Sequence, residues 1–167
     1  MKHSLSTLSS DDSAEPRTQY AAICWRKAKS GIEVLLITSR ETRRWVVPKG
    51  WPIRGIDGPH TAEREAWEEA GVEGKVSKNC LGLFSYQKVL DRDQCVPCVV
   101  AVYGLHVGKL SRRYPEQGQR QRKWFTAAEA AELVLEPELR TIFLAVSDGS
   151  LAVQDVPLGK KTSPSAR

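Results

Sequence analysis

The most constraining feature of this sequence is a loop rich in Gly and Pro, residues 50–59, that runs directly into a helix-forming segment. Pro59 suits the first helical turn, and Asp57 or Gly58 can cap the helix. Gly71 supplies the stop, because glycine readily adopts the left-handed conformation that ends many helices. The sequence therefore predicts a helix over about 59–70.

The two flanks of this helix carry different residue types. One flank holds small side chains that allow close packing on a sheet: Ala62, Ala66 and Ala70. The other holds three acidic side chains at i, i+3 and i+4: Glu65, Glu68 and Glu69. Like charges at these spacings destabilise an isolated helix by roughly 0.2–0.5 kcal/mol per pair. A divalent cation such as Mg²⁺, which prefers oxygen ligands, can offset the repulsion; an ordinary acidic surface helix is the alternative.

The rest of the chain has the pattern of a mixed sheet with helices on its faces, an α/β (α+β) fold. Strands are predicted at 19–26, 32–38, 45–48, 74–87, 96–107 and 123–125, and further helices at 126–135 and 138–146. A charged loop is expected over 88–94. We expect one domain over 17–150, a flexible N-terminal segment over 1–16 and a flexible C-terminal tail over 151–167.

A longer pattern surrounds the acidic helix. From Gly50 the sequence follows Gly-x5-Glu-x7-Arg-Glu-U-x-Glu-Glu-x-Gly-U, where U is a bulky aliphatic residue, with two departures. Ile56 stands where the first Glu belongs, and Ala66 stands where a larger aliphatic is usual. With its loop and helix context, this pattern resembles the signature of the Nudix hydrolases. The resemblance implies the Nudix fold, an α/β/α sandwich with a central mixed β-sheet.

The resemblance also implies roles for single residues. Glu65 and Glu69 would bind Mg²⁺, with Mn²⁺ as a possible substitute, and Glu68 would be a ligand or the general base. The backbone carbonyl of Gly50 or Lys49 would complete the metal site. Arg64 and Gly71 would be structural, with Arg64 orienting the glutamates. The family arginine usually pairs with the Glu that Ile56 replaces here, and Asp57 could substitute for it.

Residues outside this pattern bear on the substrate. The run Arg44 to Pro52 is similar to the corresponding segment of diphosphoinositol polyphosphate phosphohydrolases, a subgroup that often cleaves diadenosine polyphosphates. Arginine forks suit phosphate oxygens, so a polyphosphate needs several cations. The predicted substrate-binding residues are Arg17, Thr38, Ser39, Arg40, Arg44, Lys49, Lys88, Arg92, Arg120 and Arg122. Trp45 and Trp51 could stack on a base or brace the loop.

Three functions remain open at this point. The first is a hydrolase for diphosphoinositol polyphosphates or diadenosine polyphosphates. The second is a Nudix pyrophosphohydrolase for nucleoside triphosphates, nucleotide sugars or RNA caps. The third is a Nudix-fold binding or regulatory module without turnover, which the intact glutamates argue against.

Composition sets the remaining expectations. The net charge of +5 carries little weight, because part of it lies in the C-terminal tail. Of the four cysteines, only Cys95 and Cys98 have a CxxC spacing, and a second ligand pair for zinc is missing. We therefore expect buried or half-buried free thiols in a reducing cytoplasm. With no long apolar segment and no signal peptide, we expect a cytoplasmic protein whose partner is a small-molecule polyphosphate, without membrane or DNA binding.

Overall fold

The computed structural model describes residues 15–154, and the predictions for the chain ends beyond them lie outside the described residues. A mixed sheet forms the middle layer in the order β3-β2-β1-β6-β5, with β4 paired to β1 and β7 paired to β2. β1 and β6 are parallel, whereas the other pairs are antiparallel. The strands are β1 (Arg17–Ala28), β2 (Gly31–Thr38), β3 (Trp45–Val46), β4 (Lys49–Gly50), β5 (Val72–Asp91), β6 (Gln94–Leu110) and β7 (Arg122–Thr126).

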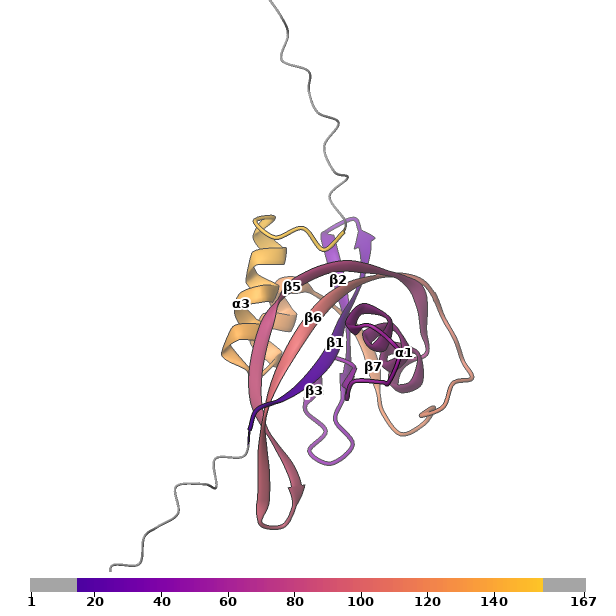
Figure 1. The fold of residues 1–167 in the computed structure, drawn as a ribbon. Helices are drawn as coiled ribbons and strands as arrows, with labels where there is room; N and C mark the ends of the chain where they lie inside the picture. The colour runs from indigo at the N-terminus through magenta and orange to yellow at the C-terminus, as the bar shows by residue number, and fades with distance from the viewer. Residues whose placement is uncertain (1–14, 155–167) are drawn as a thin grey trace, which may run out of the picture.

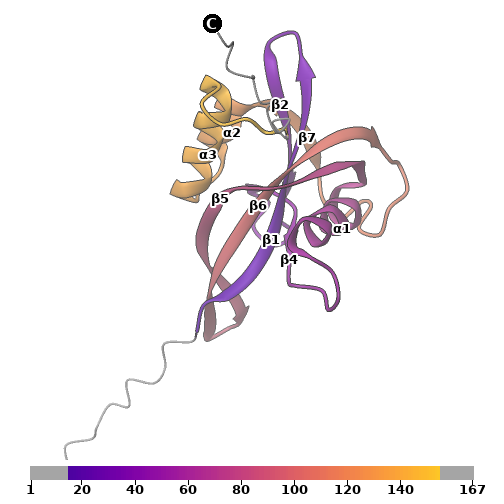
Figure 2. The ribbon, with the colours of Figure 1, turned by 45° about the horizontal axis from the view of Figure 1, so that its top comes forward.

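Helices cover both faces of the sheet, which confirms the predicted three-layer class. α1 (Gly58–Ala70) lies on one face, and α2 (Ala127–Leu133) and α3 (Pro137–Asp148) lie on the other (Figures 1 and 2). Each face has its own buried cluster of apolar side chains. In the described part of the chain, no helix is long and apolar enough to cross a membrane.

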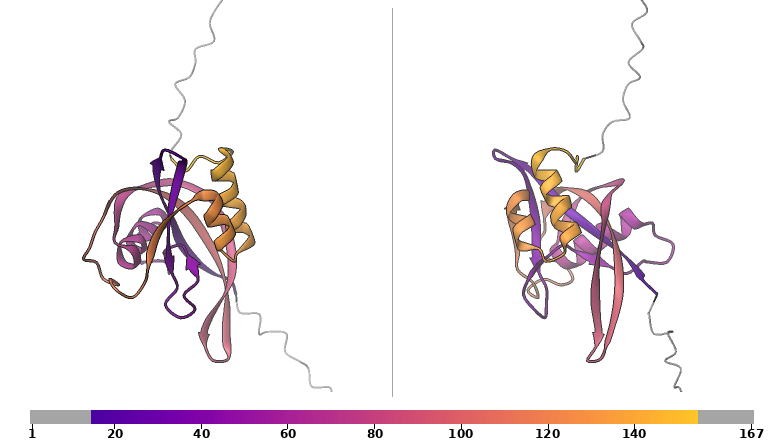
Figure 3. Two further views of the ribbon diagram at one scale, coloured as in Figure 1. Left: turned by 180° about the vertical axis from the view of Figure 1, so that it is seen from behind. Right: turned by 90° about the vertical axis from the view of Figure 1, so that its left-hand side faces the viewer.

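The predicted charged loop at 88–94 is wrong. β5 and β6 continue to Asp91 and Gln94 and form a long hairpin that projects beyond the rest of the sheet (Figure 3). Backbone pairing does not depend on side-chain polarity, so charged residues can occupy strand positions that face solvent. Register shifts interrupt the pairing, for example between Val76 and Cys80.

The folded unit extends past the predicted boundary at residue 150. Leu151 N donates to the carbonyl oxygen of Ala145 at 3.0 Å, and the Val153 side chain is buried in the cluster beneath α2 and α3. The cysteines are free, as expected, but only two of them are buried: Cys24 and Cys98, whereas Cys80 and Cys95 are exposed.

Candidate active site

α1 holds the acidic side chains because both of its ends and one flank are fixed. The Asp57 carboxylate accepts from His60 N at 2.9 Å, and Gly71 ends the helix with φ of 66°. Ala62, Ala66 and Ala70 are fully buried against the sheet. The helix ends and the packing flank are those predicted, and the packing directs Glu65, Glu68 and Glu69 to one cavity.

Gly50 lies directly against α1, where a larger residue would displace the Glu65 carboxyl group. Strand pairing with Tyr20 holds Gly50 in place. A Cβ atom at this position would overlap the Glu65 carboxyl group, with Oε2 only 2.6 Å away. The neighbouring Lys49 N donates to Glu69 Oε2 at 3.4 Å. The two backbone positions predicted to assist metal binding therefore lie directly against two of the glutamates.

A fourth carboxylate, Glu116, joins the three on α1. It lies in the segment between β6 and β7 that passes beside α1 (Figure 1), and Glu116 N donates to the Glu68 carbonyl oxygen at 2.9 Å. Its side chain lines the same cavity of about 580 Å³. The sequence analysis missed Glu116. Its position between Pro115 and Gly118 gives no indication that it contacts α1.

Burial and mutual repulsion change the protonation of this cluster. Burial, followed by Glu69, Glu68 and Glu116, raises the pKa of Glu65 to about 7. Burial also raises the pKa of Glu69 to about 7, although Arg120 and Lys49 act in the opposite direction. Ionised carboxylates this close repel one another, and a bound cation would offset the repulsion.

The carboxylates fit a Mg²⁺ site that other ligands complete. Within residues 15–154, no three Asp, Glu, His or Cys side chains lie close enough to form a metal site by themselves. Mg²⁺ usually takes one or two carboxylates together with waters and substrate phosphates. The convergence of four carboxylates on one cavity, with Glu65 against Gly50, suits this type of binding.

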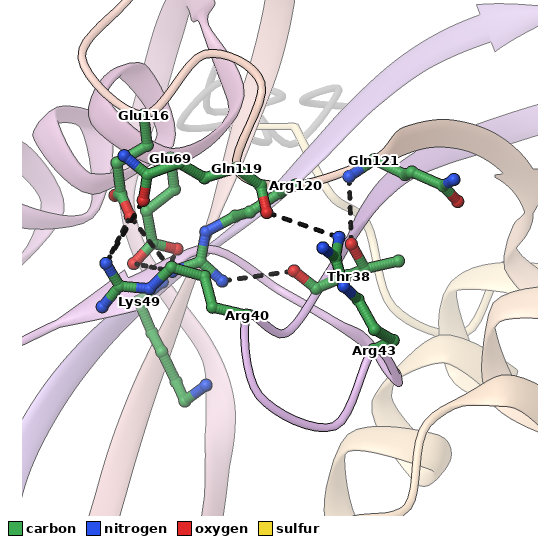
Figure 4. A network of polar contacts seen from close by, with 9 residues as sticks. All are labelled: Thr38, Arg40, Arg43, Lys49, Glu69, Glu116, Gln119, Arg120 and Gln121. Atoms are coloured by element: carbon green, nitrogen blue, oxygen red, sulfur yellow. Dashed lines mark hydrogen bonds and ion pairs between the residues drawn. The ribbon is translucent and has the colours of Figure 1, made fainter.

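Arg120 bridges two of the carboxylates, and Arg40 pairs with one of them, as Figure 4 shows. Arg120 Nη2 lies 3.7 Å from Glu69 Oε1 and 3.4 Å from Glu116 Oε1. Arg40 Nη1 lies 3.4 Å from the same Glu116 oxygen. Arg120 Nη1 also donates to the Thr38 carbonyl oxygen, and the Arg120 side chain is only 10% exposed. A largely buried cation, Arg120, and a more exposed one, Arg40, thus lie beside the acidic cluster.

A second cavity of about 380 Å³ adjoins the first and shares several lining residues with it, including Lys49 and Lys88. Burial lowers the pKa of Lys49, although Glu69 and Glu136 act in the opposite direction. Six of the ten predicted substrate-binding residues line one or both cavities: Ser39, Arg40, Arg44, Lys49, Lys88 and Arg120.

The other four lie elsewhere. Arg122 Nη1 donates to the Ala70 carbonyl oxygen at 2.7 Å and so closes the end of α1. Thr38 is buried, and its Oγ1 accepts from Gln121 N. Arg92 lies in the exposed turn of the β5–β6 hairpin. Arg17 is exposed on β1, with its guanidinium 5.9 Å from the centre of the Trp51 ring.

The loop before α1 is not held by a pair between Arg64 and Asp57, which the resemblance to the Nudix signature had left open. Arg64 is exposed, and within residues 15–154 it has no carboxylate at ion-pair distance. Asp57 does not replace the missing glutamate, because its carboxylate caps α1 and lies 2.6 Å from His60 Nδ1. Instead, Ile56 N donates to the Ile53 carbonyl oxygen at 3.0 Å, so a backbone turn and the helix cap fix the loop.

The two tryptophans considered for base stacking have different surroundings. Trp45 packs edge-on against Phe125, with ring centres 4.9 Å apart, beside the buried cluster. It is therefore a brace for the strands. Trp51 follows Gly50 directly and lines the cavity of the glutamates.

Sequence comparison assigns the family. The profile of the NUDIX domain matches residues 16–146, and this chain belongs to the Nudix family. Nudix hydrolase 16, mitochondrial, of Arabidopsis thaliana is 34% identical over 112 residues, which are 65% of this chain and 62% of the relative. Human diphosphoinositol polyphosphate phosphohydrolase 3-alpha is 30% identical over 116 residues, 68% of this chain and 66% of the relative.

Solved structures agree on the fold. An Ap4A hydrolase of C. elegans has a TM-score of 0.58 at 19% identity and covers 81% of this chain and 98% of its own. A NUDIX hydrolase from Nitrosomonas europaea has a TM-score of 0.63 at 14% identity, covering 83% and 93%. This chain spans 52% to 62% of the length of the plant relatives that it matches.

Proposed function

We propose that this protein is a Mg²⁺-dependent hydrolase that cleaves phosphoanhydride bonds of polyphosphorylated small molecules by attack of water. The observation that carries the proposal is the convergence of Glu65, Glu68, Glu69 and Glu116 on one cavity, where Arg120 contacts Glu69 and Glu116 and Arg40 contacts Glu116. An acidic surface helix would not gather a fourth carboxylate and two cations around one cavity.

Each side chain has a distinct task in this proposal. Glu65 and Glu69 would hold Mg²⁺, with the Gly50 carbonyl oxygen as a further ligand, and Mn²⁺ could substitute. Bound Mg²⁺ supplies Lewis acidity toward the phosphoryl oxygens and favours ionisation of water. Glu68 accepts the proton of the attacking water as general base. Glu116 holds Arg40 and Arg120 in place through its ion pairs.

The cations act on the substrate rather than on the water. Arg40, Arg120 and Lys49 line both cavities, next to the acidic cluster. They neutralise negative charge on the phosphate chain and on the departing phosphate. Because the two cavities adjoin, a chain of several phosphates can lie along both of them.

Relatives narrow the substrate to two leading classes. A human relative is named for diphosphoinositol polyphosphates, and a structural neighbour is named as an Ap4A hydrolase. We propose one of these two classes as the substrate of this chain. The alternatives are a pyrophosphohydrolase for nucleoside triphosphates, nucleotide sugars or RNA caps, and a binding module without turnover.

A substrate panel tests the proposal. The full chain is assayed with Mg²⁺, and with EDTA as control, on diadenosine polyphosphates, diphosphoinositol phosphates, nucleoside triphosphates, nucleotide sugars and capped RNA. We expect metal-dependent turnover, with the highest kcat/KM on one of the first two classes. A preference for any of the other three would support a different Nudix pyrophosphohydrolase, and no turnover on any would support the binding module.

The cellular setting is a separate proposal. We propose a reducing compartment, the cytoplasm, because the four cysteines are free thiols. Three of the plant relatives are named mitochondrial. Localisation of a tagged full chain would decide between the two compartments.

A further inference from the structure

Trp51 has a position that the proposed chemistry does not use. It follows Gly50 directly, and its half-buried side chain lines the cavity of the four glutamates. Two cations from different strands lie over its ring. The Arg17 guanidinium of β1 is 5.9 Å from the ring centre, and Lys88 Nζ of β5 is 5.6 Å from it. The indole of Trp51 thus meets two cations beside the cavity of the glutamates.

The spacing over Trp51 is looser than in comparable pairs. Of the six cation–ring contacts within residues 15–154, the two to Trp51 are the longest. By contrast, the Arg26 guanidinium lies 4.0 Å from the centre of the Trp124 ring, in direct contact with it. A flat ring inserted between two layers needs about 3.5 Å on each side, or about 7 Å in all. Exposed Arg17 and half-buried Lys88 each have to move away from the ring by about a further ångström to admit a base.

The charged residues that line the cavities indicate whether Trp51 contacts a phosphorylated ring or an uncharged part of the substrate. Six cationic side chains line the two cavities together: Arg40, Arg44, Lys49, Arg64, Lys88 and Arg120. Five carboxylates line them as well: Glu41, Glu65, Glu68, Glu69 and Glu116. Arg40, Arg44 and Arg120 are already in ion pairs with carboxylates. Because these carboxylates neutralise part of the positive charge, the cavities cannot surround with cations a ring that carries phosphates on every side.

A linear polyphosphate with a flat, uncharged end fits this arrangement better. Its phosphates need cations only along one line, which Lys49, Arg40 and Arg120 provide. Its base needs an aromatic face, and nucleobases stack well on tryptophan whatever the base. Arginine can also stack on the second face of a base.

We propose that Trp51, Arg17 and Lys88 form a subsite for the base of a nucleoside polyphosphate, with the base between the indole and the cations. The inference rests on the proposed hydrolase function and names its substrate class as dinucleoside polyphosphates. Trp51 thereby selects for a base-bearing substrate over diphosphoinositol polyphosphates.

Selectivity is the first test. The ratio of kcat/KM for diadenosine tetraphosphate to that for a diphosphoinositol pentakisphosphate is measured in the full chain with Mg²⁺. Trp51→Leu should lower this ratio about tenfold, and Trp51→Phe should restore most of it. Trp124→Leu is the matched control, because Trp124 also stacks on an arginine but lies outside both cavities; its ratio should equal that of the wild type. An unchanged ratio in Trp51→Leu overturns the subsite.

A binding measurement separates this inference from the proposed function. Adenosine tetraphosphate is titrated while tryptophan fluorescence is followed, which requires no turnover. We expect quenching in the wild type and in Trp124→Leu, and its loss in Trp51→Leu. If the panel shows no hydrolysis but this pattern holds, the proposed function fails and the base subsite stands. If hydrolysis occurs but quenching is equal in all three proteins, only the subsite fails.

Discussion

The two faces of the sheet are covered by different kinds of side chain. On one face, α1 packs through Ala62, Ala66 and Ala70. On the other, α3 packs through larger side chains: Leu139, Ile142, Phe143 and Val146. Small side chains bury little area but allow the helix to approach closely, whereas large ones remove more apolar surface from water. The α1 face therefore serves the positioning of the site, and the α3 face serves the stability of the fold.

The largest expected effect is on the α3 face. Phe143 is fully buried, so Phe143→Ala should lower the free energy of unfolding by about 3–5 kcal/mol through lost burial and a cavity. Urea denaturation measures this change. The fraction that remains folded should keep its kcat, because Phe143 does not line either active-site cavity. A loss of kcat in folded protein would break the division between the two faces.

On the α1 face we expect the reverse. Glu68→Gln should lower kcat by at least about 10²-fold, because an amide cannot accept the proton of the attacking water. The melting temperature should stay near that of the wild type. Glu132→Gln, an exposed glutamate of α2, is the matched control and should leave both quantities unchanged. A Glu68→Gln protein that retains the wild-type rate would show that Glu68 is not the base.

The helix caps provide a closer comparison. Thr126 forms a capping box with Glu129 at the start of α2, and Thr126→Ala should cost about 1 kcal/mol of stability with kcat unchanged. Asp57→Ala removes the cap of α1 and should lower the melting temperature and kcat together, since α1 carries the glutamates. Thermal melts and initial rates give both readouts. Equal effects on kcat from the two variants would contradict the division.

The smallest effect concerns pH and metal. Folding raises the pKa of Glu65 and of Glu69 to about 7 from 4.5, mainly through burial. Between these pH values the folded protein therefore binds more protons than the unfolded chain. Protonation of the two glutamates thus contributes to the free energy of unfolding at low pH, and this contribution is lost as the pH rises through about 7.

Without metal, the melting temperature should therefore fall by a few degrees between about pH 5.5 and pH 8. Mg²⁺ binds the ionised carboxylates and should raise the melting temperature more at the higher pH. Thr126→Ala is the control, because it should lower the melting temperature equally at both pH values. An equal effect of Mg²⁺ at both pH values would show that metal binding does not depend on the ionisation of Glu65 and Glu69.

Features encoded by neighbouring residues could be predicted from the sequence. The α1 helix, its Asp57 cap and its Gly71 end depend on local chemistry, and they are found as expected. The first two predicted strands are also found, although both are longer than predicted and β2 begins at Gly31. The class of the fold followed from the order of these elements.

Features that depend on distant residues could not be predicted in this way. Glu116 reaches α1 through a single backbone hydrogen bond to Glu68, which no local pattern encodes. Arg120 and Arg122 are near neighbours in sequence, yet one contacts Glu69 and the other the end of α1. Only the course of the segment between β6 and β7 determines which arginine faces the cavity.

The parallel pairing of β1 with β6 has a consequence for synthesis on the ribosome. Arg17 pairs with Cys98 and Trp25 with His106, so β1 can pair with β2 early but with β6 only after about eighty more residues have been made. Glu116 and Arg120 emerge later still. A nascent chain therefore exposes its acidic helix before the site around it exists, and the complete cavity assembles only near the end of translation of this domain.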